Sequence, residues 1–143
     1  MSVEENKALV RRLFEALNTS NWAVLDELMV PDYVNHNPGQ REKPGREGYR
    51  ESLISGRNAF PDFQWTIEDM IAEGDKVVVR LTGSGTHGVE FMGVAPTNKR
   101  VTTTAIFILR IVSGKLVEEW SNADLLGFFQ QLGVIPSLTL GRE

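Results

Sequence analysis

Apolar residues in the first part of the chain recur at helical spacing. They form a stripe over residues 3–17, preceded by a capping-box pattern at residues 2–5. A second, shorter helix is expected over residues 22–30, where a proline stops it, and a third over about residues 46–59. The polar, turn-rich stretch at residues 32–39 is interpreted as a loop. The N-terminal part is therefore expected to contain three helices.

From Pro61 onward the apolar period changes to two, which is typical of strands. The expected strands cover residues 63–72, 76–82, 101–112 and 115–120. Glycines at residues 83–88 would allow a sharp bend or bulge, and residues 91–99 are expected to form an irregular flap. A helix over residues 125–132 closes the chain. This order predicts an α+β domain: a strongly bent, mainly antiparallel sheet that forms a cone with the helices and can hold a small molecule.

Length and composition exclude several classes of protein. The chain has 143 residues, of which 41% are hydrophobic, which suits a single domain over residues 1–143 with its core in about 6–133 and a loose tail at 136–143. The net charge is -4 and the basic residues form no stripe, so nucleic acid is not an expected partner. There is no cysteine, which excludes disulfides and thiolate catalysis. No apolar run has the length of a membrane span, so we expect no membrane association and a cytoplasmic location.

Asp124 is the candidate catalytic acid, because it lies at the junction between the last strand and the last helix. Continuing the strand alternation places it on the same side as Trp120. A carboxylate beside apolar rings loses hydration and can take and return a proton near neutral pH. Asp is also a favoured N-cap, and Asp124 precedes the helix at the right place. The residues alone leave both interpretations open.

Several motifs together resemble a known family. They are NKALVRRLFEALN, LDELMVPDYVNH, AFPDF, IAEGDKVVVR, GTH, FMGVAPTNKRV and GKLVEEWSNADLLGFFQQLG. In this order they resemble the SnoaL-like polyketide cyclase family of the nuclear transport factor two-like superfamily. The similarity runs over about residues 6–133.

The resemblance implies a cone-shaped fold, an apolar pocket and a homodimer formed through the outer face of the sheet. It implies intramolecular aldol ring closure without cofactor or metal, on a small apolar or aromatic substrate. Asp124 matches the acid/base of the family, and His87 matches the histidine of its GTH motif. Asn35 and His36 match polar pocket positions after the PDY motif.

The strand around Phe107 departs from the family pattern. Some members that close rings carry a polar residue there, often histidine, whereas this chain is apolar over residues 105–108. Phe107 and Trp120 are therefore expected to form apolar walls for substrate. Hydrolysis or isomerisation in the same pocket, and ligand binding without catalysis, remain alternatives. The direction of the Asp124 carboxylate discriminates them: toward a cavity near His87 and Asn35 for an enzyme, toward the amides around Gly127 for a binding protein.

Overall fold

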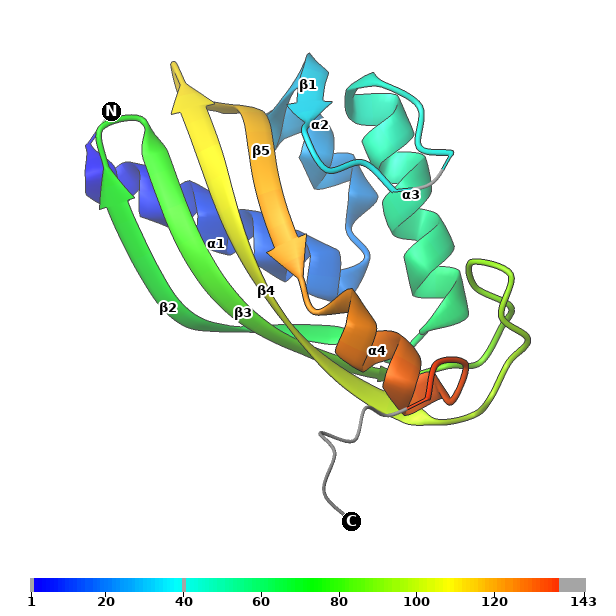
Figure 1. The fold of residues 1–143 in the computed structure, drawn as a ribbon. Helices are drawn as coiled ribbons and strands as arrows, with labels where there is room; N and C mark the ends of the chain where they lie inside the picture. The colour runs from blue at the N-terminus through cyan, green and yellow to red at the C-terminus, as the bar shows by residue number, and fades with distance from the viewer. Residues whose placement is uncertain (1, 40, 137–143) are drawn as a thin grey trace.

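A single curled sheet organises the chain (Figure 1). The computed structural model describes residues 2–39 and 41–136, so the predicted tail from 137 onward lies outside the described residues. The helices are α1 (Val3–Thr19), α2 (Leu25–Leu28), α3 (Gly45–Ala59) and α4 (Leu125–Leu132), with a 3₁₀ turn η1 (Trp22–Val24) before α2. The strands are β1 (Met29–Asn35), β2 (Gln64–Glu73), β3 (Lys76–Thr86), β4 (Arg100–Val112) and β5 (Lys115–Ala123), in the spatial order β1-β5-β4-β3-β2.

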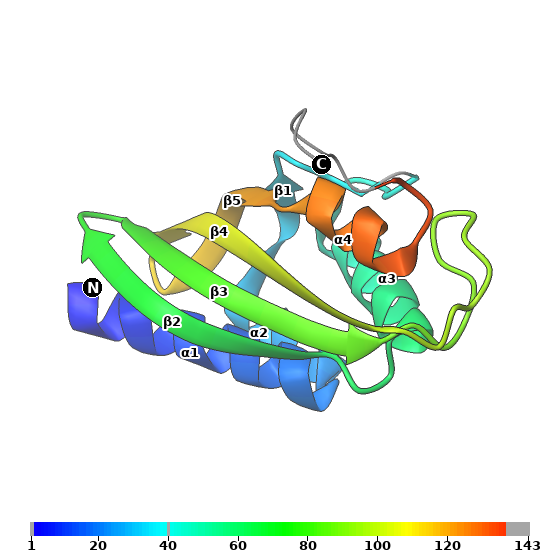
Figure 2. The ribbon, with the colours of Figure 1, turned by 60° about the horizontal axis from the view of Figure 1, so that its bottom comes forward.

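Helix α1 lies across the concave face of the sheet, and Figure 2 shows it beneath β2 and β3. Its predicted capping box is confirmed, because the Ser2 side chain accepts from the Glu5 amide while Glu5 accepts from the Ser2 amide. Its apolar stripe, which includes Val10, Leu13 and Phe14, is buried. It forms the main core with inward-facing residues of β3 and β4, such as Val79 and Leu109. The α+β class predicted from the periodicity is confirmed.

The edge strand β1 was not predicted. The second helix is short, consisting of η1 and α2, and the chain enters β1 at Met29, before the expected stop at Pro31. The expectation of a loop at residues 32–39 was therefore wrong up to Asn35. Strand β1 pairs in parallel with β5 at the sheet edge. Pro31 is tolerated there because an edge strand forms ladder hydrogen bonds on one side only, so a residue without an N–H group can be accommodated.

The glycines at the end of β3 serve close packing. Strand β3 continues through them to Thr86 in unbroken register with β4. A side-chain carbon at Gly83 would overlap the ring of Phe63, and one at Gly85 would lie 3.0 Å from the Phe63 Cα atom. The glycines that were expected to allow a bend instead leave space for Phe63 to pack directly against β3.

A second, smaller apolar cluster lies between β4 and α4. It contains Ala59, Phe60, Val101, Phe128 and Leu132. The flap over residues 88–99 borders this cluster through Phe91. The opposite, outer face of the sheet carries none of the four helices (Figure 2). Within the described residues, no helix is long and apolar enough to cross a membrane.

Candidate functional site: an apolar cavity between α3, the sheet and α4

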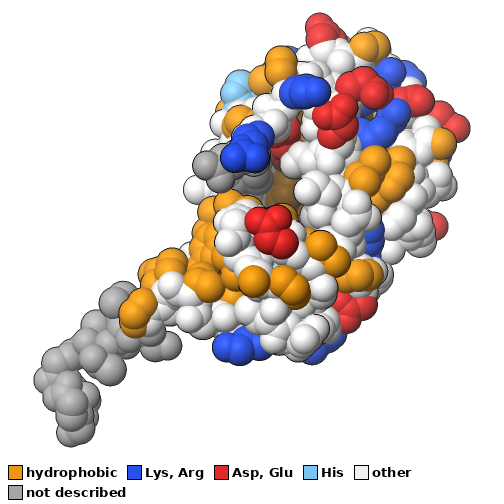
Figure 3. All heavy atoms as spheres, turned by 90° about the vertical axis from the view of Figure 1, so that its right-hand side faces the viewer, with side chains coloured by type: hydrophobic (Ala, Val, Ile, Leu, Met, Phe, Trp, Pro, Cys, Tyr) orange, Lys and Arg blue, Asp and Glu red, His pale blue; other side chains and the backbone are white. Residues whose placement is uncertain are grey.

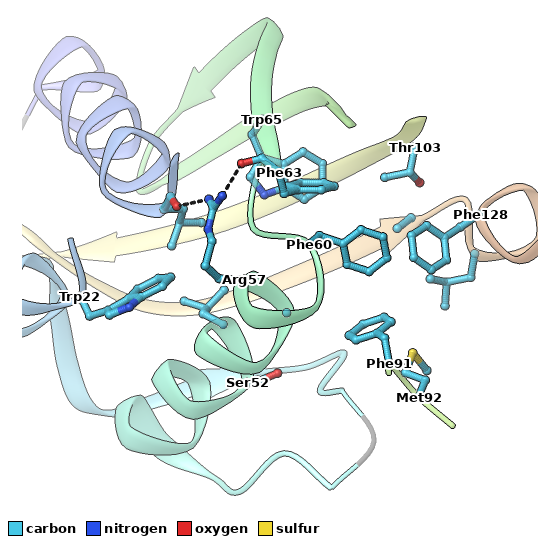
Figure 4. A pocket seen from close by; sticks show the side chains of 15 residues that line it. Trp22, Ser52, Arg57, Phe60, Phe63, Trp65, Phe91, Met92, Thr103 and Phe128 are labelled. Atoms are coloured by element: carbon cyan, nitrogen blue, oxygen red, sulfur yellow. Dashed lines mark hydrogen bonds between the residues drawn. The ribbon is translucent and has the colours of Figure 1, made fainter. Parts of the chain in front are cut away.

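A cavity of about 290 Å³ lies between α3, the inner face of the sheet and α4. Figure 4 shows aromatic rings from separate segments pointing into it. The aromatic lining residues are Trp22, Phe60, Phe63, Trp65, Phe91 and Phe128. Phe60 contacts Phe63, Phe91 and Phe128 with ring centroids 5.4–6.4 Å apart. Such a lining suits a flat, apolar ligand of aromatic or polyketone type.

Few polar side chains reach this cavity. They come from Ser52, Arg57 and Thr103, and the described lining contains no carboxylate and no imidazole. Arg57 donates to the carbonyl oxygens of Phe63 at 2.7 Å and Leu17 at 2.8 Å, as the dashed lines in Figure 4 show. Burial lowers the pKa of its guanidinium. Arg57 thus joins the end of α1 to the chain that leads into β2, and it closes one side of the cavity.

Asp124 lies at the rim of the cavity and caps α4. Its carboxylate accepts a hydrogen bond of 2.9 Å from the Gly127 amide, and the residue is exposed. Its two chain neighbours, Ala123 and Leu125, both line the cavity. The Thr103 hydroxyl, another lining group, donates to the backbone carbonyl of Asp124 at 3.4 Å. The carboxylate therefore points toward the amide of Gly127, which is the direction expected for a binding protein, and its residue lies next to two residues of the cavity wall.

His87 is fully buried next to the aromatic wall. Its Nδ1 accepts from the Thr97 amide at 3.2 Å and lies 3.1 Å from the Thr97 hydroxyl. Because a backbone amide can only donate, the neutral ring carries its proton on Nε2, which has no partner among the described residues. The ring stacks on Phe60 at 5.2 Å. His87 itself does not line the cavity, and it ties both ends of the flap together through Thr97 and Lys99.

The other predicted site residues lie elsewhere. His36 stacks on Trp120 with ring centroids 4.6 Å apart, and its Nε2 lies 2.7 Å from a Glu118 carboxylate oxygen. Asn35 donates to Glu42 at 3.1 Å near the edge of the sheet. Phe107 faces inward but packs in the main core. None of these residues lines the apolar cavity, so the structure does not bring them together with Asp124.

Residues 39 and 41–43, α3 and the flap line a second, more polar hollow of about 600 Å³. It shares Ser52, Phe91 and Met92 with the apolar cavity, so the two spaces adjoin. Figure 3 shows the side of the molecule with the flap and α4, where hydrophobic side chains gather around a hollow. A ligand can therefore have an apolar body in the cavity and a polar end at its mouth.

Sequence reasoning missed Glu119, the carboxyl whose pKa is raised most among the described residues. Glu119 on β5 is 1% exposed and accepts a hydrogen bond of 2.7 Å from the Tyr33 hydroxyl. Burial raises the pKa of its carboxyl from 4.5 to about 7, although hydrogen bonds from Tyr33 and Tyr49 lower it. The signal was present in the alternation of β5, because consecutive acids at 118 and 119 must lie on opposite faces of the sheet.

Comparison with known proteins shows which family the chain resembles. The family model described as SnoaL-like polyketide cyclase matches residues 7–132. The aklanonic acid methyl ester cyclase DauD of Streptomyces sp. (strain C5) is 31% identical over 132 residues, which cover 87% of this chain and 80% of DauD.

Solved structures agree with this placement. IdmH, a putative polyketide cyclase from Streptomyces antibioticus, superposes with a TM-score of 0.79 at 35% identity, covering 90% of this chain and 98% of IdmH. AclR from Streptomyces galilaeus, described as a putative hydroxylase, superposes with a TM-score of 0.84 at 32% identity, covering 97% of this chain and 91% of AclR. The chain belongs to the SnoaL-like polyketide cyclase family. The match and the cyclase-named relatives support a cyclase-type enzyme with the fold of the nuclear transport factor two-like superfamily.

Within the described residues, no group of three His, Asp or Glu side chains is placed to hold a metal ion.

Proposed function

We propose that the protein closes a ring by intramolecular aldol condensation of an apolar carbonyl substrate held in the aromatic cavity. Asp124 removes a proton from the carbon beside one carbonyl, and the resulting enolate carbon attacks a second carbonyl of the same molecule. The new alkoxide then takes the proton back from Asp124, so no atom is lost or gained. The family match, the apolar lining and the two lining hydroxyls at Ser52 and Thr103 support this reaction.

One observation carries the choice of Asp124. Among the acids of the described chain, it is the one whose two sequence neighbours both line the cavity. Its carboxylate is held by a single amide hydrogen bond on an exposed helix end, which is worth about 1 kcal/mol. A rotation about its Cα–Cβ bond breaks that bond and turns the acid away from α4. The proposed cycle therefore alternates Asp124 between the cap and the substrate.

Two substitutions separate the helix-capping role of Asp124 from its proposed role as acid/base. Asn and Ser both cap helices well but neither transfers protons as a carboxylate does. Asp124→Asn and Asp124→Ser are expected to keep the native melting temperature and to lower the turnover of aklanonic acid methyl ester, the substrate named for DauD, by about 100-fold or more. Turnover equal to the native protein in both variants removes Asp124 as the acid/base.

Ligand binding without catalysis is the second candidate. It is favoured by the capping position of the Asp124 carboxylate and by the lack of acids and imidazoles in the described lining of the cavity. It predicts that the native protein binds aromatic polyketones, and that neither the native protein nor Asp124→Asn converts them.

The homodimer belongs to the same proposal. The outer face of the sheet carries an apolar row in register across four strands: Ile71, Val78, Ile108 and Trp120. The side chain of Ile71 is 61% exposed, and that of Ile106 nearby is 48% exposed. Such a row suits contact with a second copy of the chain. Sedimentation is expected to show a dimer at micromolar concentration and a monomer for Ile108→Glu; a native monomer contradicts this.

A cytoplasmic location, which suits a chain without cysteine, is also proposed.

A further inference from the structure

Glu119 connects three elements at the edge of the sheet. It projects from β5 and accepts a hydrogen bond of 2.7 Å from the Tyr33 hydroxyl of β1, and the Tyr49 hydroxyl of α3 lowers the pKa of the same carboxyl. The two tyrosine rings contact each other at 5.2 Å, and all three side chains are buried. The proposed mechanism uses none of these groups, so a buried acid in this position calls for another explanation.

This cluster joins two walls of the ligand cavity. Tyr49 lies one turn before Ser52 and Leu53 on α3, and both of these residues line the cavity. Glu119 lies on the same strand as Ala123, which lines the opposite wall. Tyr33 bonds Glu119 and its ring contacts the ring of Tyr49, so this cluster helps to fix the spacing between α3 and the sheet.

Among the described residues, no positive charge contributes to the pKa of Glu119. Tyr33 and Tyr49 face it as neutral phenols, because burial raises the pKa of both well above 10.0. Glu42, in the segment before α3, adds a like charge, and β4 presents Leu109 opposite. The cations of neighbouring segments have other partners: Arg46 and Arg50 pair with Asp26, Lys43 pairs with Glu51, and Arg110 pairs with Glu118 on the outer face. The buried contact between β5 and α3 is therefore electrically neutral only when Glu119 is protonated.

We propose that the protonation state of Glu119 controls how firmly α3 packs on the sheet, so that the cavity binds apolar ligands more tightly at pH 6 than at pH 8. Loss of the proton leaves a negative charge buried between β5 and α3. This costs free energy, which is lowered when α3 moves away from the sheet and water reaches the carboxylate. Opening moves α3, and with it the cavity wall that contains Ser52 and Leu53. The inference goes beyond the proposed reaction and needs only that the cavity binds a ligand.

The test uses 1-aminoanthracene, a neutral fluorescent aromatic, titrated into the full chain at pH 6 and pH 8. The dissociation constant of the native protein is expected to rise by about fivefold or more at the higher pH. Glu119→Gln keeps a neutral side chain of the same shape, so its dissociation constant is expected to stay at the native pH 6 value. Glu118→Gln is the matched control on the outer face and is expected to keep the native pH dependence.

A second variant keeps the proposal testable if Glu119→Gln fails to fold. Tyr49→Phe removes a hydrogen bond that favours the charged carboxylate, so the midpoint of the binding change is expected to move to higher pH. Amide hydrogen exchange of α3, corrected for the intrinsic rate, is expected to accelerate between pH 6 and pH 8 in the native protein and in Glu118→Gln, but not in Glu119→Gln.

Three results overturn the proposal. They are a native affinity that does not change with pH, a Glu119→Gln variant that retains the change, and an α3 exchange rate that is independent of pH. Failure of the proposed reaction is distinguishable, because the probe assay requires no turnover.

Discussion

Replacing Glu119 by Gln should make the protein more stable at pH 8. In the native protein the carboxyl has a pKa of about 7, compared with 4.5 for the unperturbed group. A group whose pKa is raised by folding stabilises the folded state while it is protonated in both states, and this contribution is lost as the pH rises through the folded value. The stabilisation is therefore complete below about pH 4.5 and is lost by about pH 7 to 8.

The magnitude follows from the two pKa values. At about 1.4 kcal/mol for each tenfold change in proton affinity, a rise from 4.5 to about 7 corresponds to about 3 kcal/mol. Glutamine resembles the protonated acid at every pH and does not lose this amount. The free energy of unfolding of Glu119→Gln, relative to the native protein, should therefore increase by about 3 kcal/mol between pH 4.5 and pH 8, which is about 10 °C in melting temperature.

Urea unfolding at several pH values between 4.5 and 8 measures this difference. Subtracting the native curve cancels the other titrating groups, such as Asp62 and Glu118, because both proteins share them. Glu118→Gln, on the opposite face, should show no rise over this range. A stability difference between Glu119→Gln and the native protein that stays constant with pH would refute the reasoning, since it would mean that Glu119 titrates alike in the folded and unfolded chains.

Three further predictions concern the cavity. Gly83→Ala should lower the free energy of unfolding by about 1–3 kcal/mol in urea titrations, because its methyl group overlaps the ring of Phe63; a neutral result would show that the ring moves freely. Thr97→Val removes the hydroxyl next to His87 Nδ1, so limited proteolysis should cut the flap faster while α1 stays protected, and an unchanged cleavage rate would contradict the role of this contact. Arg57→Gln loses hydrogen bonds that join α1 to the chain before β2, and it should lower the melting temperature; Arg12→Gln, on an exposed ion pair, should change it little.

Elements governed by local rules could be predicted from the sequence. The capping box at Ser2, the amphipathic stripe of α1 and the alternation of β3 and β4 depend on residues close together in the chain. The capping role of Asp124 was one of two open interpretations, because the N-cap is itself a local arrangement.

The prediction failed where distant segments decide the outcome. Strand β1 has a proline and polar residues, and it becomes a strand because the edge of β5 offers it backbone partners some 85 residues later along the chain. The predicted site residues were chosen as neighbours in motifs, yet His36 and Trp120 contact each other away from the apolar cavity.

The sequence by itself determined the fold class, most of the elements and the family, since these follow from periodicity, local capping and motif order. Tertiary structure alone decided which aromatic rings meet in the cavity, because Trp22, Phe60, Phe91 and Phe128 come from segments with no common spacing. It also decided that Glu119, rather than its neighbour Glu118, is the acid with the raised pKa. That difference depends on Tyr33 and Tyr49 closing over one face of the strand, and residue types do not reveal which face the rest of the chain will cover.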